Sequence, residues 1–110
     1  GEFVLDNTSL SIDNGIMPKE FVLHQNYPNP FNPTTQIRYD IPESKFVSII
    51  IYDVMGRKIK SLININQEAG YRSITWNATN DHGQPVSAGM YIYTIQAGEF
   101  RQTRKMLLLK

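Results

Sequence analysis

The sequence predicts an all-β fold, an antiparallel β-sandwich of about seven strands. From Thr34 onward, apolar and polar residues alternate with the period of two that is typical of half-buried strands. Residues that favour tight turns interrupt this alternation at intervals of about 8 to 15 residues. No stretch of useful length shows the 3.6-residue period of a helix. Together these three observations favour a sandwich of short strands over any helical or mixed fold.

Length and composition exclude several classes of protein. The chain has 110 residues, 41% of them hydrophobic and 19% charged, which suits a single globular domain. Eleven basic and ten acidic residues leave a net charge of +1, which argues against a nucleic-acid binder that works by charge. The absence of cysteine excludes disulfides, thiol catalysis and cysteine-ligated zinc, but does not identify the compartment. We expect no membrane-spanning segment, because no apolar run approaches ~18 residues, and no signal peptide is recognised.

The domain boundary is expected near residue 21. Residues 1–20 are polar, rich in Asn, Asp and Ser, and without a sustained period, so we interpret them as a linker or lead-in. The first three residues, Gly-Glu-Phe, could be a cloning remnant. Residues 21–110 form the predicted domain, and its first element is a brief strand at residues 20–24.

Each later strand is predicted from an apolar set that shares one face. The segments, in order, are TQIRYDI, FVSIIIYD, RKIKSLIN, RSITWN, MYIYTIQAG and FRQTRKMLLL. The residues that we expect to face the core are Ile37, Tyr39, Ile41, Val47, Ile49, Ile51, Ile59, Ile74, Trp76, Tyr91, Tyr93 and Ile95. Turn chemistry separates these strands, with Gly56 in DVMGRK and Gly70 in EAGY placed where a tight turn needs a positive φ.

No arrangement of residues in the sequence points to catalysis. His24 and His82 lie far apart, and neither belongs to a metal-binding spacing such as H-x-H or H-E-x-x-H. There is no G-x-S-x-G elbow for a serine nucleophile. The glycine-containing GQPVSAG loop does not lead from a strand into a helix, so it is not a phosphate-binding loop. We therefore predict that the domain is not an enzyme, with no catalytic residue, no metal ligand set and no cofactor.

Two groups of residues allow a binding function or a structural one. The NATNDHG loop, residues 77–83, concentrates oxygen donors that calcium prefers, but Asn and Asp at this density also form backbone-mimicking turns, which is the favoured interpretation. Trp76 and the six tyrosines could form a carbohydrate-binding platform. Most of these rings are in phase with aliphatic residues, which favours a core position instead, although Tyr52 and Tyr71 could be exposed.

The C-terminal RKMLLLK stretch also has two interpretations. Four apolar residues in a row between cations are typical of a strand that is buried on both faces and closes the sandwich. The same residues could form a recognition tag offered to a receptor, and a docked strand can still present an edge. The candidate partner-recognition residues are Lys105, Met106, Leu107, Leu108, Leu109 and Lys110.

Taken together, the segments YPNPFNPTTQIRYDIP, VSIIIYDVMGRKIKSL and AGYRSITWNATNDHGQPVSAGMYIYTIQAGEFRQTRKMLLLK resemble one family. They are similar, from about residue 21 to the last residue, to the type A C-terminal sorting domain of cargo proteins of the bacterial type IX secretion system. YDVMGR and GQPVSAGMYIY are also similar to the immunoglobulin-like domain of flagellar hook-capping proteins. The family motif and structural positions are Pro28, Asn29, Pro30, Phe31, Gly56, Gly83, Gly89 and Tyr91.

The resemblance implies a fold and a function. The fold would be a seven-stranded immunoglobulin-like sandwich at the end of a larger exported protein. The domain would direct an N-terminal cargo domain from the periplasm across the outer membrane, through the type IX translocon, to the cell surface or the extracellular space. A sortase-like peptidase would then remove it by a cut in the lead-in before about residue 21.

Two other functions remain open from the sequence. One is an accessory carbohydrate- or protein-binding β-sandwich of a secreted multidomain enzyme, and the other is an assembly domain like that of the hook cap. The proline-rich segment NYPNPFNP fits all of these as a stiff clamp at the domain boundary, because proline fixes φ and favours extended geometry in the residue before it. Phe31, its lone phenylalanine, is predicted to fill one end of the sandwich.

Overall fold

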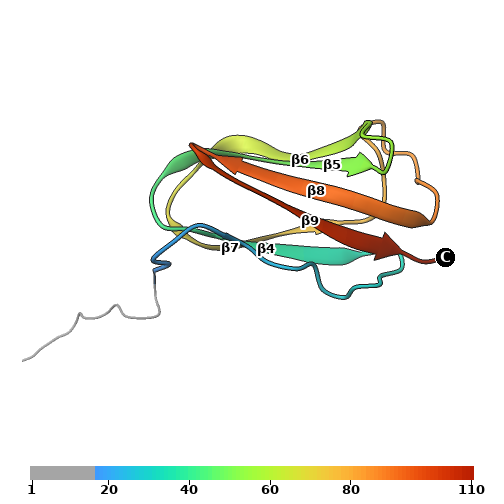
Figure 1. Cartoon of the computed structure of the whole chain (residues 1–110), viewed down its shortest axis with the longest axis horizontal. Helices are drawn as coiled ribbons and strands as arrows, with labels where there is room; N and C mark the ends of the chain where they lie inside the picture. The colour runs from blue at the N-terminus through green and yellow to red at the C-terminus, as the bar shows by residue number, and fades with distance from the viewer. Residues whose placement is uncertain (1–16) are drawn as a thin grey trace, which may run out of the picture.

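The computed structural model describes residues 17–110, which form two antiparallel sheets packed face to face (Figure 1). This confirms the predicted all-β, immunoglobulin-like sandwich of seven strands. None of the described residues lies in a helix, so this range holds no helix that could cross a membrane. The strands are β3 (Val22–Leu23), β4 (Thr35–Ile41), β5 (Lys45–Asp53), β6 (Lys58–Gln67), β7 (Gly70–Trp76), β8 (Gly89–Ala97) and β9 (Phe100–Leu108).

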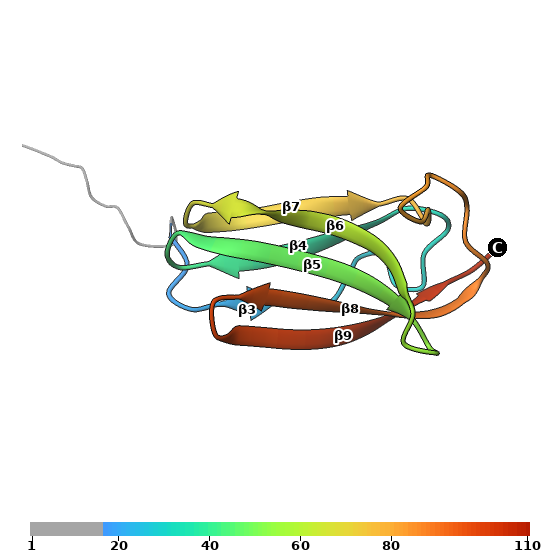
Figure 2. The same ribbon diagram turned by 90° about the horizontal axis from the view of Figure 1, so that it is seen from above.

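The chain passes repeatedly between the two sheets. The smaller sheet has the order β3-β4-β7 and the larger one β6-β5-β8-β9 (Figure 2). Hairpins join β5 to β6 and β8 to β9 within the larger sheet, whereas the chain changes sheet after β4, β6 and β7. The final strand therefore lies at the edge of the larger sheet, and β6 and β7 lie at the edges of the two sheets on the opposite flank.

The core lies between the sheets and consists of the inward-facing residues of the alternating strands. Ile59 and Ile74 are only half-buried, because β6 and β7 are edge strands and leave one side of these residues uncovered. The other residues that the sequence predicts for the core are all buried: Ile37, Tyr39, Ile41, Val47, Ile49, Ile51, Trp76, Tyr91, Tyr93 and Ile95.

Aromatic side chains close one end of the core. Phe31 is only 2% exposed and fills this end as predicted. Its ring centroid lies 5.8 Å from that of Trp76, which in turn meets the ring of Tyr91 edge-on at 5.4 Å. Trp76 donates its indole N–H to the Thr79 carbonyl oxygen at 2.8 Å, so its one polar atom is satisfied inside the fold. These rings are core residues and form no exposed platform for a sugar.

A buried hydroxyl joins the larger sheet to the segment that follows β3. Tyr93 on β8 donates its hydroxyl to the His24 carbonyl oxygen, and the same oxygen atom of Tyr93 accepts the Asn26 N–H, both at 2.8 Å. Burial raises the pKa of Tyr93 to about 12, which keeps this hydroxyl neutral and able to donate. The bridge holds the two layers together near β9.

We expect the Phe31→Ala variant to be destabilised by about 3 kcal/mol or more, because it leaves a cavity against Trp76. Thermal or urea unfolding would measure this loss. The control is Tyr27→Ala, four positions earlier in the same segment, where the side chain is largely exposed and we expect little change. An unchanged melting temperature for Phe31→Ala would contradict its role in closing the core.

We expect the Tyr93 bridge to make stability depend on pH in the alkaline range. The folded-state pKa of about 12 lies above the ordinary value near 10, so this contribution is complete below pH 10 and is lost as the pH rises from about 10 to about 12. Tyr93→Phe should cost about 1–3 kcal/mol at neutral pH, because the buried Asn26 N–H loses its acceptor. The variant should also show a shallower fall of the unfolding free energy above pH 10. Parallel alkaline slopes for the two proteins would contradict this assignment.

Candidate functional site

The six predicted recognition residues belong mostly to β9, which pairs with β8 from Phe100 opposite Ala97 to Leu108 opposite Gly89. Alternation along the strand divides them into two sets. Met106 and Leu108 point into the core and are only 1% exposed. The others are accessible to different degrees: Lys105 and Lys110 are exposed, Leu107 is half-buried and Leu109 is 47% exposed. The stretch is therefore partly core and partly surface.

The proline segment pairs with the outer edge of β9. The Phe31 N–H donates to the Leu107 carbonyl oxygen at 3.0 Å, and the Leu109 N–H donates to the Phe31 carbonyl oxygen at 2.9 Å. Asn29 accepts the Leu107 N–H on its side-chain oxygen at 3.0 Å. The peptide bonds before Pro28, Pro30 and Pro33 are cis. The last strand is thus hydrogen-bonded on both sides at its C-terminal end, which answers the question of whether it is paired or free.

Contacts continue upstream along the same edge. Gln25 donates its side-chain amide to the Lys105 carbonyl oxygen at 2.7 Å. Arg104 donates its Nε–H to the Leu23 carbonyl oxygen at 2.6 Å. The segment from Leu23 to Phe31 is therefore bonded to β9 over most of its length. Removing Lys105 to Lys110 would therefore delete most of these contacts, and we expect the truncated domain to be destabilised.

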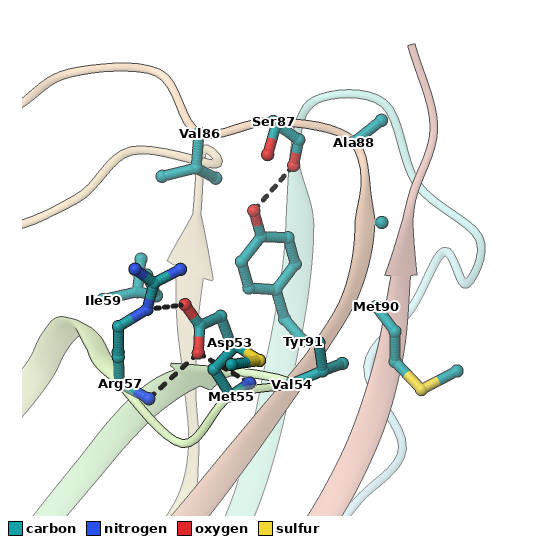
Figure 3. Close-up of a pocket in the computed structure, with 11 residues that line it drawn as sticks. Asp53, Val54, Met55, Arg57, Ile59, Val86, Ser87, Ala88, Met90 and Tyr91 are labelled. Carbon is teal, nitrogen blue, oxygen red and sulfur yellow. Dashed lines mark hydrogen bonds and ion pairs between the residues drawn. The ribbon is translucent and has the colours of Figure 1, made fainter.

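A surface pocket of about 390 Å³ lies at the same end of the sandwich as the C-terminus (Figures 1 and 3). The β5–β6 turn forms one wall, and the segment leading into β8 forms the other. Val54, Met55 and Met90 are exposed apolar residues of its lining. Because β8 pairs with β9, Met90 lies directly opposite Leu107. Exposed apolar groups therefore gather around the end of the last strand.

The polar groups of this pocket are bonded to one another. The Asp53 carboxylate accepts the backbone N–H groups of Met55 and Arg57 and the Nε–H of Arg57, each at 2.8 to 2.9 Å (Figure 3). The backbone hydrogen bond from Arg57 is the largest of the effects that lower the pKa of Asp53. Tyr91 donates its hydroxyl to the Ser87 carbonyl oxygen at 2.6 Å. This chemistry shapes the turn and leaves an apolar rim, which suits docking rather than catalysis.

The structure brings several family motif positions to this end. Gly89 lines the pocket with Tyr91, and Gly56 lies in the adjoining turn with φ +85°. Pro28 accepts the Thr35 hydroxyl on its carbonyl oxygen at 2.8 Å, which fixes the start of the proline segment against β4. Gly83 lies apart from the pocket lining, in the NATNDHG loop, with φ +78°. Pro30 lies between Asn29 and Phe31, the two residues that contact β9.

The NATNDHG loop forms tight turns and covers part of a sheet edge. Asn80 accepts the N–H groups of His82 and Gln84 on its side-chain oxygen, as the favoured interpretation of this loop predicts. Asp81 donates its N–H to the Ile59 carbonyl oxygen, and its carboxylate accepts the Ser61 N–H, both at 3.0 Å. Within residues 17–110 no three His, Cys, Asp or Glu side chains are grouped to hold a metal ion.

Sequence reasoning did not identify the apolar pocket rim. The signal was present in Val54 and Met55, two apolar residues in a tight turn, where polar residues are usual. Their proximity to Met90 and the C-terminus depends on the pairing of β5, β8 and β9, which no local pattern reveals.

Solved structures resemble this fold. One is dimeric latent PorU from Porphyromonas gingivalis, with 21% identity and a TM-score of 0.64 over 89% of this chain and 10% of that one. PorZ, an essential surface component of the type IX secretion system of the same bacterium, has 20% identity and a TM-score of 0.56 over 80% of this chain and 11% of its own. The hook-capping protein FlgD from Xanthomonas campestris has 22% identity and a TM-score of 0.54, covering 84% of this chain and 64% of FlgD.

At these identities the likenesses establish the fold alone, including the expected similarity in fold to hook-capping proteins. The chain spans only about a tenth of the length of the PorU and PorZ chains. No curated protein sequence matches it. In contrast, residues 25–109 match the family described as the secretion system C-terminal sorting domain, and this match takes in the proline segment, the pocket and the whole of β9. The chain therefore belongs to the family of secretion system C-terminal sorting domains.

Proposed function

We propose that residues 21–110 direct an attached N-terminal cargo protein from the periplasm across the outer membrane, through the type IX translocon. The observation that carries this proposal is the family match over residues 25–109, since the family is the C-terminal sorting signal of that system. A sorting domain of this kind is not itself catalytic. Its role implies export of the cargo to the cell surface or the extracellular space.

The arrangement of the two ends supports this function. The chain enters the described fold at one end of the sandwich, and Lys110 lies at the other (Figures 1 and 2). A cargo joined through the lead-in would therefore be attached at the end remote from the C-terminus. This leaves the pocket rim and the last residues accessible while the cargo is still attached.

We assign different roles to the six C-terminal residues. Met106 and Leu108 anchor the strand in the core, so their contribution to export is to hold the strand in place. The accessible set, which we propose is read by the translocon, is Lys105, Leu107, Leu109 and Lys110. Leu109 and Lys110 extend beyond β9. Among the described residues, Leu109 is hydrogen-bonded to the fold through its backbone N–H, which donates to the Phe31 carbonyl oxygen.

The lead-in is the proposed position of later cleavage by a sortase-like peptidase. Strand pairing begins at Val22, and the preceding Phe21 stacks on Phe100 with ring centroids 5.3 Å apart. A cut before residue 21 would therefore leave all seven strands and this stacked pair in the released domain.

We expect a fusion of a periplasm-directed reporter to this domain to lose export when Leu109→Asp and Lys110→Glu are combined. An exposed apolar contact worth about 1.4 kcal/mol in binding corresponds to a tenfold change in affinity, so the ratio of extracellular to periplasmic reporter should fall about tenfold or more. The measurement is quantitative immunoblotting of the two fractions. The melting temperature of the isolated variant should stay near that of the wild type, because neither side chain is in the core.

The matched control is Met17→Asp combined with Lys19→Glu. Met17 is also 47% exposed, and these residues lie at the opposite end of the chain, so the same charge change should leave export normal. Normal export of the Leu109 and Lys110 variant would contradict the assignment of the recognition residues. Deleting Lys105 to Lys110 is a poorer test, because it also removes the buried Met106 and Leu108.

A further inference from the structure

The flank formed by the edges of β6 and β7 is open, unlike the flank that the proline segment closes. The first half of β6 is covered, because Asp81 bonds to Ile59 and Ser61 on its outer edge. Beyond a β-bulge after Ser61, the stretch from Ile63 to Gln67 has β5 on one side. Within residues 17–110, no segment pairs with its other side.

The direction of the backbone groups in this stretch follows from the register. Ser61 directs its N–H outward to Asp81, so its pair with Ile50 is not hydrogen-bonded. Adjacent pairs of an antiparallel ladder alternate between hydrogen-bonded and non-hydrogen-bonded pairs. The bulge at Leu62 interrupts this alternation, so the direction beyond it follows from the unbroken β8–β9 ladder. Leu107 directs its peptide groups outward to Asn29 and Phe31, so its pair with Met90 is not hydrogen-bonded, and alternation along the ladder makes Ile95 with Gln102 a hydrogen-bonded pair. The peptide groups of Ile95 thus face β9, those of the opposite Ile49 face β6, and Ile49 with Ile63 is hydrogen-bonded. The peptide groups of Asn64 and Asn66 therefore point outward, and no hydrogen bond to them occurs among the described residues.

The sequence of this edge lacks the usual protection against strand pairing. Exposed edges are normally guarded by charged residues, proline or bulges. β9 carries Arg101, Arg104 and Lys105, and β7 carries Arg72. Residues 61–67, Ser-Leu-Ile-Asn-Ile-Asn-Gln, contain no charge, proline or glycine, and the bulges of β6 precede Ile63. This composition is typical of segments that pair with copies of themselves.

Ile65 occupies the centre of the open stretch. It pairs with the buried Val47 and so points to the same face of the sheet, yet it is 54% exposed because no segment of residues 17–110 covers the flank. Asn64 and Asn66, whose peptide groups point outward, stand symmetrically on either side of it. If two β6 strands paired antiparallel about a twofold axis at Ile65, the outward peptide groups of Asn64 in one copy would therefore face those of Asn66 in the other.

We propose that β6 pairs antiparallel with β6 of a second copy of this chain, about a twofold axis at Ile65. Asn64 of each copy faces Asn66 of the other in a hydrogen-bonded pair that exchanges two bonds. The two Ile65 side chains face each other in a non-hydrogen-bonded pair, where side chains approach most closely. The absence of charge permits this self-pairing, whereas two β9 edges would repel each other.

The contact is short, because Asp81 blocks the edge at Ser61 and the strand ends at Gln67. A surface of this size lies below the ~1,200 Å² of stable interfaces, so association is weak and depends on concentration. The interface is isologous and closes as a dimer with no further growth. The interface does not include the proposed C-terminal recognition residues, so the dimer proposal can be tested independently of the sorting function.

A cysteine cross-link tests the proposed register. The natural chain has no cysteine, so Ile65→Cys introduces a single thiol. The facing Cα atoms of such a pair lie about 4.5 Å apart, within the range of a disulfide. Under mild oxidation we expect a disulfide-linked dimer of twice the 12.6 kDa chain mass, formed at least about tenfold faster than for Met55→Cys, a more exposed control in the β5–β6 turn. Equal, slow cross-linking of both variants would overturn the proposal.

Sedimentation equilibrium over a concentration series supplies a second test. The average mass of the wild-type chain should rise above 12.6 kDa with concentration. Ile65→Lys sets like charges opposite each other, and Asn64→Pro removes an outward N–H without breaking a bond within the sheet, so both should stay monomeric. Met55→Lys should associate like the wild type. A wild-type chain that is monomeric throughout, or edge variants that associate equally well, would overturn the proposal.

Discussion

The structure depends on the contact between the proline segment and the final strand. Phe31 bonds through both of its peptide groups to the end of β9, and its side chain fills the end of the core against Trp76. Asn29 adds a side-chain bond to Leu107, 78 residues away in the sequence. Contacts this distant in sequence carry a loop-closure entropy cost, which the burial of Phe31 and its hydrogen bonds to β9 must outweigh. The sandwich is therefore completed only when its last residues are present.

This constraint fits the recognition role that we propose for the same short strand. Successive side chains of a strand point to opposite faces, so Met106 and Leu108 enter the core while Leu107 and Leu109 remain accessible. A signal built in this way is presented in one conformation, since its backbone is fixed by β8 and by the proline segment. A translocon that read these residues, as we propose, would also detect that the domain has folded, because β9 is held in place by β8 and the proline segment.

The two flanks of the sandwich differ in how far their outer strand edges are covered. On one, residues 23–31 run beside β9 and supply polar side chains and peptide groups to its outer edge. On the other, Asp81 covers the first half of β6 and leaves the second half open. The Asp81 carboxylate is thus engaged by a backbone N–H of the sheet. A loop with the composition of an ion-binding site acts here as an edge cover, because a carboxylate placed beside a sheet edge can accept its free donors.

Local patterns in the sequence determined the number of strands, the inward faces of β4, β5 and β8, and the turn at Gly56. They could do so because a period of two and a positive φ are properties of neighbouring residues. The family resemblance further indicated the sorting role. Ile59 and Ile74 show the limit of this reasoning, since their half-burial depends on which strands lie at sheet edges.

Only the tertiary structure decided which of the C-terminal residues are buried and which are exposed. A run of four apolar residues is compatible with a strand or with a free tag. Which of the four side chains are buried depends on the register of β9 against β8 and on the pairing of Phe31, from the start of the domain, with the end of β9. The apolar rim around Met90 and the open edge at Ile65 likewise could not be predicted from local sequence patterns, because each is formed by segments far apart in sequence. Local chemistry fixes what each strand can bury, but the pairing of distant strands decides what is left exposed to meet a partner.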